Sequence, residues 1–196
     1  MFIVYKTATT GLWNWRHLFG DPSQPRLCGI AWALYDDRGI MQNEKYRVCL
    51  LPPEVYIPEI ASNIHGITRT LMNIDGVPLP SVLNEFMEDW AMSTFEVGFN
   101  LSFDLHIVSN ELYLLNRATL LQERKTKRFV DLMEDSKNIC NIVNANGDLC
   151  FPRMSVAYEA ITGRKWGRYP SLTSQVRMLA EMYLVFRKRY GKAEEM

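Results

Sequence analysis

Two kinds of apolar segment follow one another along this 196-residue chain, and their order restricts the folds open to it. The first kind is short and typical of β-strands: it covers residues 1–5 and then 26–52, where the turn residues at 36–39 separate the two strands of a hairpin. The second kind has apolar residues at every third or fourth position, as at Val82 and Phe86, which is typical of amphipathic helices. Three strands are therefore expected before the first helix.

Beyond this point we expect strands and helices to alternate. Further strands are predicted at 94–100 and 128–133, and helices at 57–68, 68–74, 78–92, 104–116, 155–163 and 171–190. Strands connected through helices run parallel, so the predicted fold class is α/β: a mixed sheet with three leading strands, then parallel strands, flanked by helices. The chain has no internal repeat and no long linker, which favours a single domain over residues 1–196.

Composition argues against several classes of protein. The chain has 22 Lys and Arg and 22 Asp and Glu, so no overall charge draws it to nucleic acid or to an anionic membrane. The start of the sequence lacks the features of a signal peptide, and the longest apolar run is far too short to cross a bilayer.

Cys28, Cys49, Cys140 and Cys150 are widely spaced, which favours free thiols over a disulfide framework or a zinc site. We therefore expect a cytoplasmic protein without a membrane partner.

Six short motifs occur in a definite order. They are TATTGL (7–12), IHGIT (64–68), VGFNLSFDLHIVSNEL (97–112), FVDLME (129–134), FPRMSVAYEAITG (151–163) and VRMLAEMY (176–183). In order and approximate spacing the chain resembles the DEDD-type 3′ to 5′ exonucleases, the proofreading-exonuclease and oligoribonuclease-like branch of the ribonuclease H fold. The likeness covers roughly residues 2–186 and implies a ribonuclease H-like sheet.

The resemblance also implies where catalytic groups would stand. In the family four acids hold two divalent metal ions and a histidine acts as general base. The first two acids fall on Lys6 and Ala8, and the third is retained as Asp104. The histidine position falls on Pro170 and the last acid on Gln175. Four of these five positions have therefore lost the group that the chemistry needs.

The loss of these acids changes the electrostatics of the expected site. Four carboxylates would attract two dications, whereas Lys6 and Asp104 together carry no net charge. We expect no metal cofactor, no catalytic residue, and a Lys6 side chain that pairs with Asp104. Two simpler interpretations stay open: Asp104 caps the helix that begins beside it, or Lys6 points to solvent from an edge strand.

The resemblance further implies a groove for the end of a nucleic acid. Thr10, Leu12, His65 and Asn100 match positions near the terminal nucleotide, while Phe99 stands where the family usually has a histidine. His65 is alternatively a residue with a local hydrogen-bonding role. Basic runs at 123–128, 163–168 and 186–192 are candidates to extend the path, although such runs are usually solvated faces.

We therefore predict a catalytically inactive, exonuclease-like binding or accessory module in nucleic-acid metabolism. Its expected partners are a protein, with a homodimer as one option, and single-stranded nucleic acid. Trp13, Trp15 and Met41 would suit a protein interface, although aromatic residues in such a loop more often fold back onto the body.

The alternative is an active 3′ to 5′ exonuclease of single-stranded DNA or RNA that uses Mg²⁺ or Mn²⁺. It would need a relocated set of acids, such as Asp36, Asp37, Asp131 or Glu159. Asp131 belongs to a motif outside the family's metal cluster, so we expect it to be structural.

Overall fold

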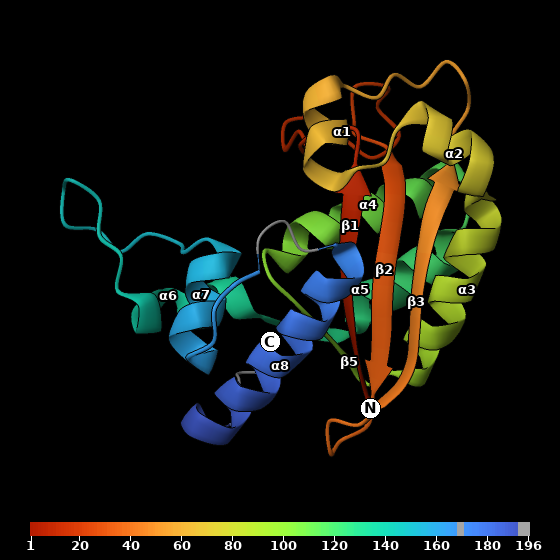
Figure 1. Ribbon diagram of the computed structural model, residues 1–196. Helices are drawn as coiled ribbons and strands as arrows, with labels where there is room; N and C mark the ends of the chain where they lie inside the picture. The colour runs from red at the N-terminus through yellow and green to blue at the C-terminus, as the bar shows by residue number, and fades with distance from the viewer. Residues whose placement is uncertain (168–170, 192–196) are drawn as a thin grey trace.

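The computed structural model describes residues 1–167 and 171–191, apart from the side chains at 118, 124 and 125 (Figure 1). Its centre is a six-stranded sheet of order β4-β3-β2-β1-β5-β6. The strands are β1 (Phe2–Thr9), β2 (Leu27–Tyr35), β3 (Met41–Leu50), β4 (Val77–Pro78), β5 (Phe95–Gly98) and β6 (Arg128–Asp131). β1, β2 and β3 are antiparallel, and β5 and β6 join the edge of β1 in parallel. The predicted mixed sheet with three leading strands is confirmed.

Helices cover both faces of the sheet (Figure 1). They are α1 (Glu59–His65), α2 (Arg69–Asp75), α3 (Leu79–Met92), α4 (Leu101–Leu114), α5 (Ala118–Thr126), α6 (Leu132–Cys140), α7 (Met154–Thr162) and α8 (Leu172–Tyr190). The periodicity did not predict α5 or α6, and β6 ends at Asp131 because α6 begins at the next residue. None of the helices in the described ranges has the length and hydropathy needed to span a bilayer.

Alternation along β1 divides the core into two layers, because successive side chains of a strand point to opposite faces. Phe2 and Val4 pack with α7 and α8, whereas Ile3 and Tyr5 pack with α3 and α4. Phe2 also stacks on Tyr35, with ring centroids 5.2 Å apart. β1 is therefore buried on both sides, and its carboxyl end is held in a fixed position.

The carboxyl end of β1 leads into the loop that connects it to β2. The β1–β2 register shifts between Ala8 and Thr9, after which Thr9 Oγ1 donates to the Gly11 carbonyl at 2.7 Å. Thr10 Oγ1 accepts from the Arg26 backbone N–H at 2.9 Å. These hydroxyls satisfy backbone groups that leave the sheet ladder. The helix α1 lies above this end of the sheet, opposite the N-terminus (Figure 1).

Candidate functional site

An ion pair stands at the carboxyl end of β1, where the resemblance places the first acids. Lys6 Nζ lies 2.5 Å from Asp104 Oδ2 and also donates to the Phe99 carbonyl at 3.3 Å. The Asp104 side chain is fully buried, and the Lys6 side chain is only 15% exposed. The predicted pair is confirmed, and the interpretation of Lys6 as a solvent-facing lysine is wrong.

The other oxygen of Asp104 is also engaged. Asp104 Oδ1 accepts from the Thr7 backbone N–H at 2.9 Å and from Thr7 Oγ1 at 2.6 Å. Helix α4 begins at Leu101 with Asn100 as its N-cap residue, so Asp104 lies inside the first turn. The interpretation of Asp104 as a helix cap is therefore wrong: its carboxylate joins α4 to β1.

This donor set does not fit a pair of divalent cations. Ala8 offers no ligand atom, and Lys6 places an ammonium against the one retained carboxylate. Within residues 1–167 and 171–191, no group of three or more His, Cys, Asp or Glu side chains is arranged to hold a metal ion. Hard divalent cations need several oxygen ligands, so Asp104 alone cannot supply a site.

Asp131 is buried next to this pair and organises the backbone around it. Its carboxylate accepts from the backbone N–H groups of Asn100, Leu101 and Met133 at 2.8, 2.7 and 3.0 Å. Burial raises the pKa of Asp131, while these three hydrogen bonds and the charge of Lys6 act in the opposite direction. Asp131 therefore fixes the starts of α4 and α6, which agrees with the structural role expected for it.

The other acids of the relocated set are bound elsewhere. Asp36 accepts two backbone N–H groups in the β2–β3 turn, and Asp37 pairs with the N-terminal ammonium at 2.7 Å. This turn follows Tyr35, which is opposite Phe2 at the far end of β1 from Ala8. Glu159 of α7 accepts from Lys165 and from the Trp166 backbone. The described structure does not gather these carboxylates around Asp104.

A groove of about 740 Å³ lies at the carboxyl end of β1 and is lined by residues of β1, α1 and the start of α8. Three of the four predicted groove positions line it: Thr10, Leu12 and His65. Two of the former catalytic positions, Ala8 and Gln175, line it as well, together with Ile60, Ile64 and Leu172. Asn100 does not line the groove and is exposed at the start of α4. Pro170 lies outside the described residues.

The groove wall carries no formal charge among the described residues. Its lining contains Thr, Ser, Asn, Gln, His and apolar side chains, and no Asp, Glu, Lys or Arg. Lys6 and Asp104 do not line it, although Thr7, which does, hydrogen-bonds to Asp104. The groove therefore suits a neutral, partly apolar ligand better than a free phosphate.

His65 is fixed by local hydrogen bonds. Its Nδ1 accepts from the Ile67 backbone N–H at 3.0 Å, so the ring proton belongs on Nε2, which lies 3.2 Å from the Thr9 carbonyl. Burial lowers the pKa of His65, against the effect of the Thr9 carbonyl. Both nitrogens are engaged, so the local hydrogen-bonding interpretation of His65 is confirmed and a free general base is not available there.

The sequence did not single out Ile60 and Ile64, which flank the groove from α1. Their four-residue spacing predicted a helix with an apolar stripe, but the two side chains are 73% and 81% exposed. Periodicity locates an apolar stripe without telling whether another element covers it.

The aromatic loop between β1 and β2 folds partly back onto the body. Trp13 is buried against the α3–α4 layer, and its ring lies 5.2 Å from that of His106. Trp15 remains 63% exposed, with its ring edge against His106 at 4.7 Å. Met41, at the start of β3, is 45% exposed.

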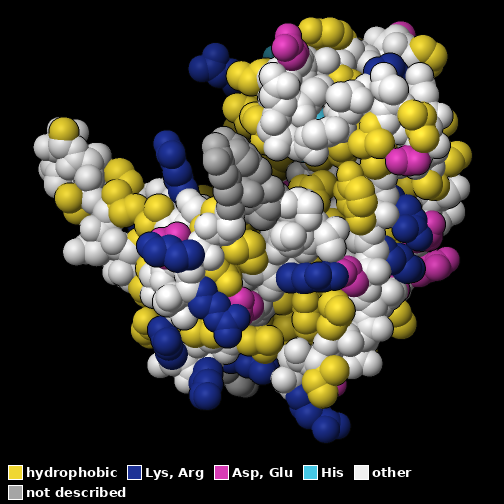
Figure 2. Space-filling view, in the orientation of Figure 1, with side chains coloured by type: hydrophobic (Ala, Val, Ile, Leu, Met, Phe, Trp, Pro, Cys, Tyr) yellow, Lys and Arg dark blue, Asp and Glu magenta, His cyan; other side chains and the backbone are white. Residues whose placement is uncertain are grey.

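The basic runs do not form one free surface. Lys127 turns inward, where its Nζ donates to the Ser93 carbonyl at 2.7 Å and lies over the Trp90 ring. Arg164 pairs with Glu181 at 2.6 Å. Basic side chains nevertheless gather over α7 and α8 (Figure 2). Arg168 and Lys192, at the ends of two predicted runs, lie outside the described residues.

No protein-family model and no curated protein sequence matches the chain. Its structure, however, is similar to solved structures of Exonuclease I. The Methylocaldum szegediense enzyme is 19% identical with a TM-score of 0.71 over 98% of this chain and 41% of its own. The E. coli enzyme in complex with a dA16 oligonucleotide is 15% identical with a TM-score of 0.72 over 96% of this chain and 41% of its own. A product-bound Exonuclease I is 16% identical with a TM-score of 0.72, and the match covers 96% of this chain and 43% of its own.

The chain thus spans about two fifths of the length of these proteins. At such low identity the likeness concerns the fold, and it confirms the architecture that the motifs implied. The chain has the α/β, ribonuclease H-like fold of the DEDD exonucleases.

Proposed function

We propose that this protein is a catalytically inactive, exonuclease-like module that acts by binding in nucleic-acid metabolism. The observation that carries the proposal is the contact between Lys6 Nζ and Asp104 Oδ2 at 2.5 Å. It places a fixed positive charge where the fold's chemistry calls for a carboxylate and a metal ion.

The energetics of this pair support the proposal. A cation could reach Asp104 only after Lys6 had moved away, and breaking a buried ion pair costs about 3–5 kcal/mol. The incoming ion would then find one carboxylate, two of whose hydrogen bonds come from Thr7. Neither the charge nor the number of ligands would compensate for that cost.

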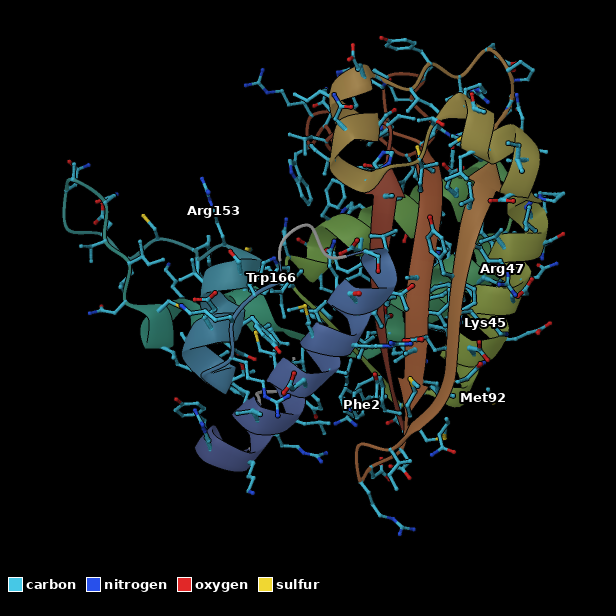
Figure 3. The ribbon with its side chains drawn as sticks, in the orientation of Figure 1. Phe2, Lys45, Arg47, Met92, Arg153 and Trp166 are labelled. Carbon is cyan, nitrogen blue, oxygen red and sulfur yellow. The ribbon has the colours of Figure 1, made fainter. Side chains whose placement is uncertain are left out.

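Binding of a single-stranded nucleic-acid end is the second part of the proposal. The uncharged groove has room for a nucleobase and sugar beside Leu12 and His65, and it lies at the same edge of the sheet as Lys6. Solved structures of the similar Exonuclease I contain dA16 and dT13 oligonucleotides. Arg153, which projects from the start of α7 into open space, could contact the backbone (Figure 3).

The third part of the proposal is that this protein binds a protein partner. We also propose that it acts in the cytoplasm. Cys28, Cys49, Cys140 and Cys150 are free thiols, which is the usual state in a reducing compartment. An accessory role of this kind uses the shape of the fold without its chemistry.

A nuclease assay tests the proposal against the alternative of an active enzyme. The purified protein is incubated in excess over 5′-labelled single-stranded DNA or RNA, with Mg²⁺ or Mn²⁺ present. The strand should stay full length whether or not a chelator is added. Chelator-sensitive shortening from the 3′ end would overturn the proposal if it disappears in Asp104→Asn and persists in Glu88→Gln. Glu88 is the matched control because it is exposed on α3 and does not belong to the acids that the alternative would use.

Retained nucleic-acid binding is measured separately. Fluorescence anisotropy with a labelled single strand should show weak binding at low salt that falls as salt rises, because phosphate contacts depend on counterion release. No change in anisotropy at the lowest salt would remove nucleic acid from the list of partners and leave the protein partner.

A further inference from the structure

A smaller cavity lies among helix α4, helix α5, strand β6 and the β1–β2 loop, and we call it the α4 cavity. Its volume is about 270 Å³, and its lining includes Phe19, His106, Ser109, Leu121, Lys127 and Phe129. The described residues that line it do not line the groove. α4 and α5 lie behind the strands in the view of Figure 1, whereas α8 lies in front of them. The α4 cavity is therefore separate from the groove at the carboxyl end of β1.

Aromatic rings stand on the wall of the α4 cavity. Phe19 and Phe129 line it, and the Phe19 ring lies 5.7 Å from the imidazole of His106. Trp15 places its ring against the same imidazole at 4.7 Å. Such flat surfaces favour planar aromatic ligands, which stack or pack edge to face against them. The volume is just below the ~300–1,000 Å³ of sites for drug-sized ligands, so the cavity suits a single planar ring system.

Two polar groups of the lining have no partner in the protein. His106 and Ser109 are three residues apart on α4, so they share one face of the helix. His106 Nδ1 lies 2.6 Å from the Ser102 carbonyl, which can only accept, so the neutral ring has its proton on Nδ1 and an acceptor at Nε2. Ser109 is 9% exposed, and its hydroxyl can donate. Within the described part of the chain, neither His106 Nε2 nor Ser109 Oγ has a hydrogen-bond partner.

The charge of the lining favours a neutral ligand. Among the described residues that line the cavity, only Lys127 carries a formal charge, and its Nζ donates to the Ser93 carbonyl at 2.7 Å. This ammonium also lies 3.6 Å from the centre of the Trp90 ring. Lys127 is thus committed to the protein, and a phosphate would find no free cation there.

We propose that the α4 cavity binds a nucleobase. A base combines a planar ring with a donor and an acceptor on one edge, as in the N6 amino group and N7 of adenine. The amino group would donate to His106 Nε2, and N7 would accept from Ser109 Oγ, while Phe19 and Phe129 contact the ring. The base belongs either to a free nucleoside or to a single strand, and its chemistry is the same in both. This inference goes beyond the proposed function, because neither the Lys6–Asp104 pair nor the groove takes part in it.

Nuclear magnetic resonance with adenosine tests the location of this site. Adenosine should shift the backbone amide signals of Ser109 and Leu121 in a saturable way. A dA oligonucleotide that shifts the same two signals would identify the strand as the source of the base, and one that leaves them unchanged would identify the free nucleoside. Absence of any shift with millimolar adenosine would overturn the inference, as would shifts confined to Thr10 and Gly66 of the groove.

Calorimetric titration tests the role of His106. His106→Phe keeps an aromatic ring but removes the acceptor, so it should weaken adenosine binding about tenfold. It should not change the binding of purine riboside, which has the same ring system without the amino group. Equal weakening for both nucleosides would contradict the hydrogen bond to His106.

A filled cavity provides a second variant. Leu121→Trp adds a large ring to a half-buried position of the lining and should abolish adenosine binding. Met92→Trp is the matched control, because Met92 is 55% exposed at the end of α3 and does not line the cavity (Figure 3). Circular dichroism should show equal helix content in both variants and the wild type. Undiminished binding by a folded Leu121→Trp variant would overturn the inference, and so would equal losses in the two tryptophan variants.

Discussion

Arg26 and Glu111 form a two-point ion pair that fixes the β1–β2 loop to helix α4. Arg26 Nε and Nη2 each lie 2.9 Å from an oxygen of Glu111, and Glu111 Oε1 also accepts from the Leu27 backbone N–H at 2.9 Å. The Glu111 side chain is fully buried. The Glu111 carboxylate is therefore a buried anchor for the end of the loop that closes one side of the groove.

Arg26→Ala should lower the free energy of unfolding by about 3–5 kcal/mol, because it leaves the Glu111 charge buried and unpaired. Chemical denaturation followed by tryptophan fluorescence measures the effect. Arg177→Ala is the control: Arg177 pairs with Glu44 but is 60% exposed, so water screens the pair and its loss should have a much smaller effect. Equal effects of the two substitutions would contradict the anchoring role of Glu111.

The Lys6–Asp104 pair should appear as strong coupling between the two residues. Lys6→Ala and Asp104→Ala should each destabilise the protein by about 3–5 kcal/mol, since each leaves the partner unpaired. The double variant should be more stable than the sum of the single effects predicts, by about 1–3 kcal/mol. A double-mutant cycle of unfolding free energies measures this coupling, and a value close to zero would mean that the contact does not stabilise the fold.

Asp131 should behave as a structural residue. Asp131→Ala removes acceptors from three backbone N–H groups and should cost about 3 kcal/mol, since each hydrogen bond to a charged group contributes about 1.5–3 kcal/mol and water replaces part of the loss. Hydrogen exchange should show faster exchange at the starts of α4 and α6. Unchanged exchange at Leu101 and Met133 would contradict this role.

His65 should make stability depend on pH in the weakly acidic range. Its pKa is lower in the folded protein than in the unfolded chain, so below about pH 6.5 the unfolded state binds a proton that the folded state does not. The free energy of unfolding should therefore decrease as the pH falls, by no more than about 1.4 kcal/mol per pH unit from this group. Solvent near the half-buried ring reduces the effect below that limit.

Denaturation of wild type and His65→Asn at several pH values isolates the His65 contribution. Asn can still accept the Ile67 backbone N–H but cannot titrate, so the variant should lose part of the decrease between pH 7 and 5. Parallel stability curves for the two proteins would show that His65 does not contribute.

Much of the fold could be predicted from the sequence because the periods of strands and helices are physically distinct. The helix over 78–92 was predicted from apolar spacing, and the hairpin was predicted from the turn residues at 36–39 between two strand-like segments. The short helices α5 and α6 were not. α6 starts directly after β6, where the Asp131 side chain caps it, and a nine-residue helix next to a strand gives little periodic signal.

The ion pair of the site was predictable because the resemblance places Lys6 and Asp104 at the same former metal site, where opposite charges attract. Lys6 and Asp104 do pair there. The exposure of Ile64 could not be predicted, because a helical stripe has the same pattern whether or not another surface covers it. The same holds for Asn100, whose place outside the groove depends on where α4 begins.

Titration with Mn²⁺, followed by the electron paramagnetic resonance signal of the free ion, tests the central claim most directly. The wild-type protein should bind Mn²⁺ no more tightly than Asp104→Asn, because Lys6 already occupies the carboxylate, whereas a Lys6→Asp, Ala8→Glu double variant should bind it more tightly. Stoichiometric binding by the wild type that disappears in Asp104→Asn would show that the pair yields to a metal ion and would contradict the account.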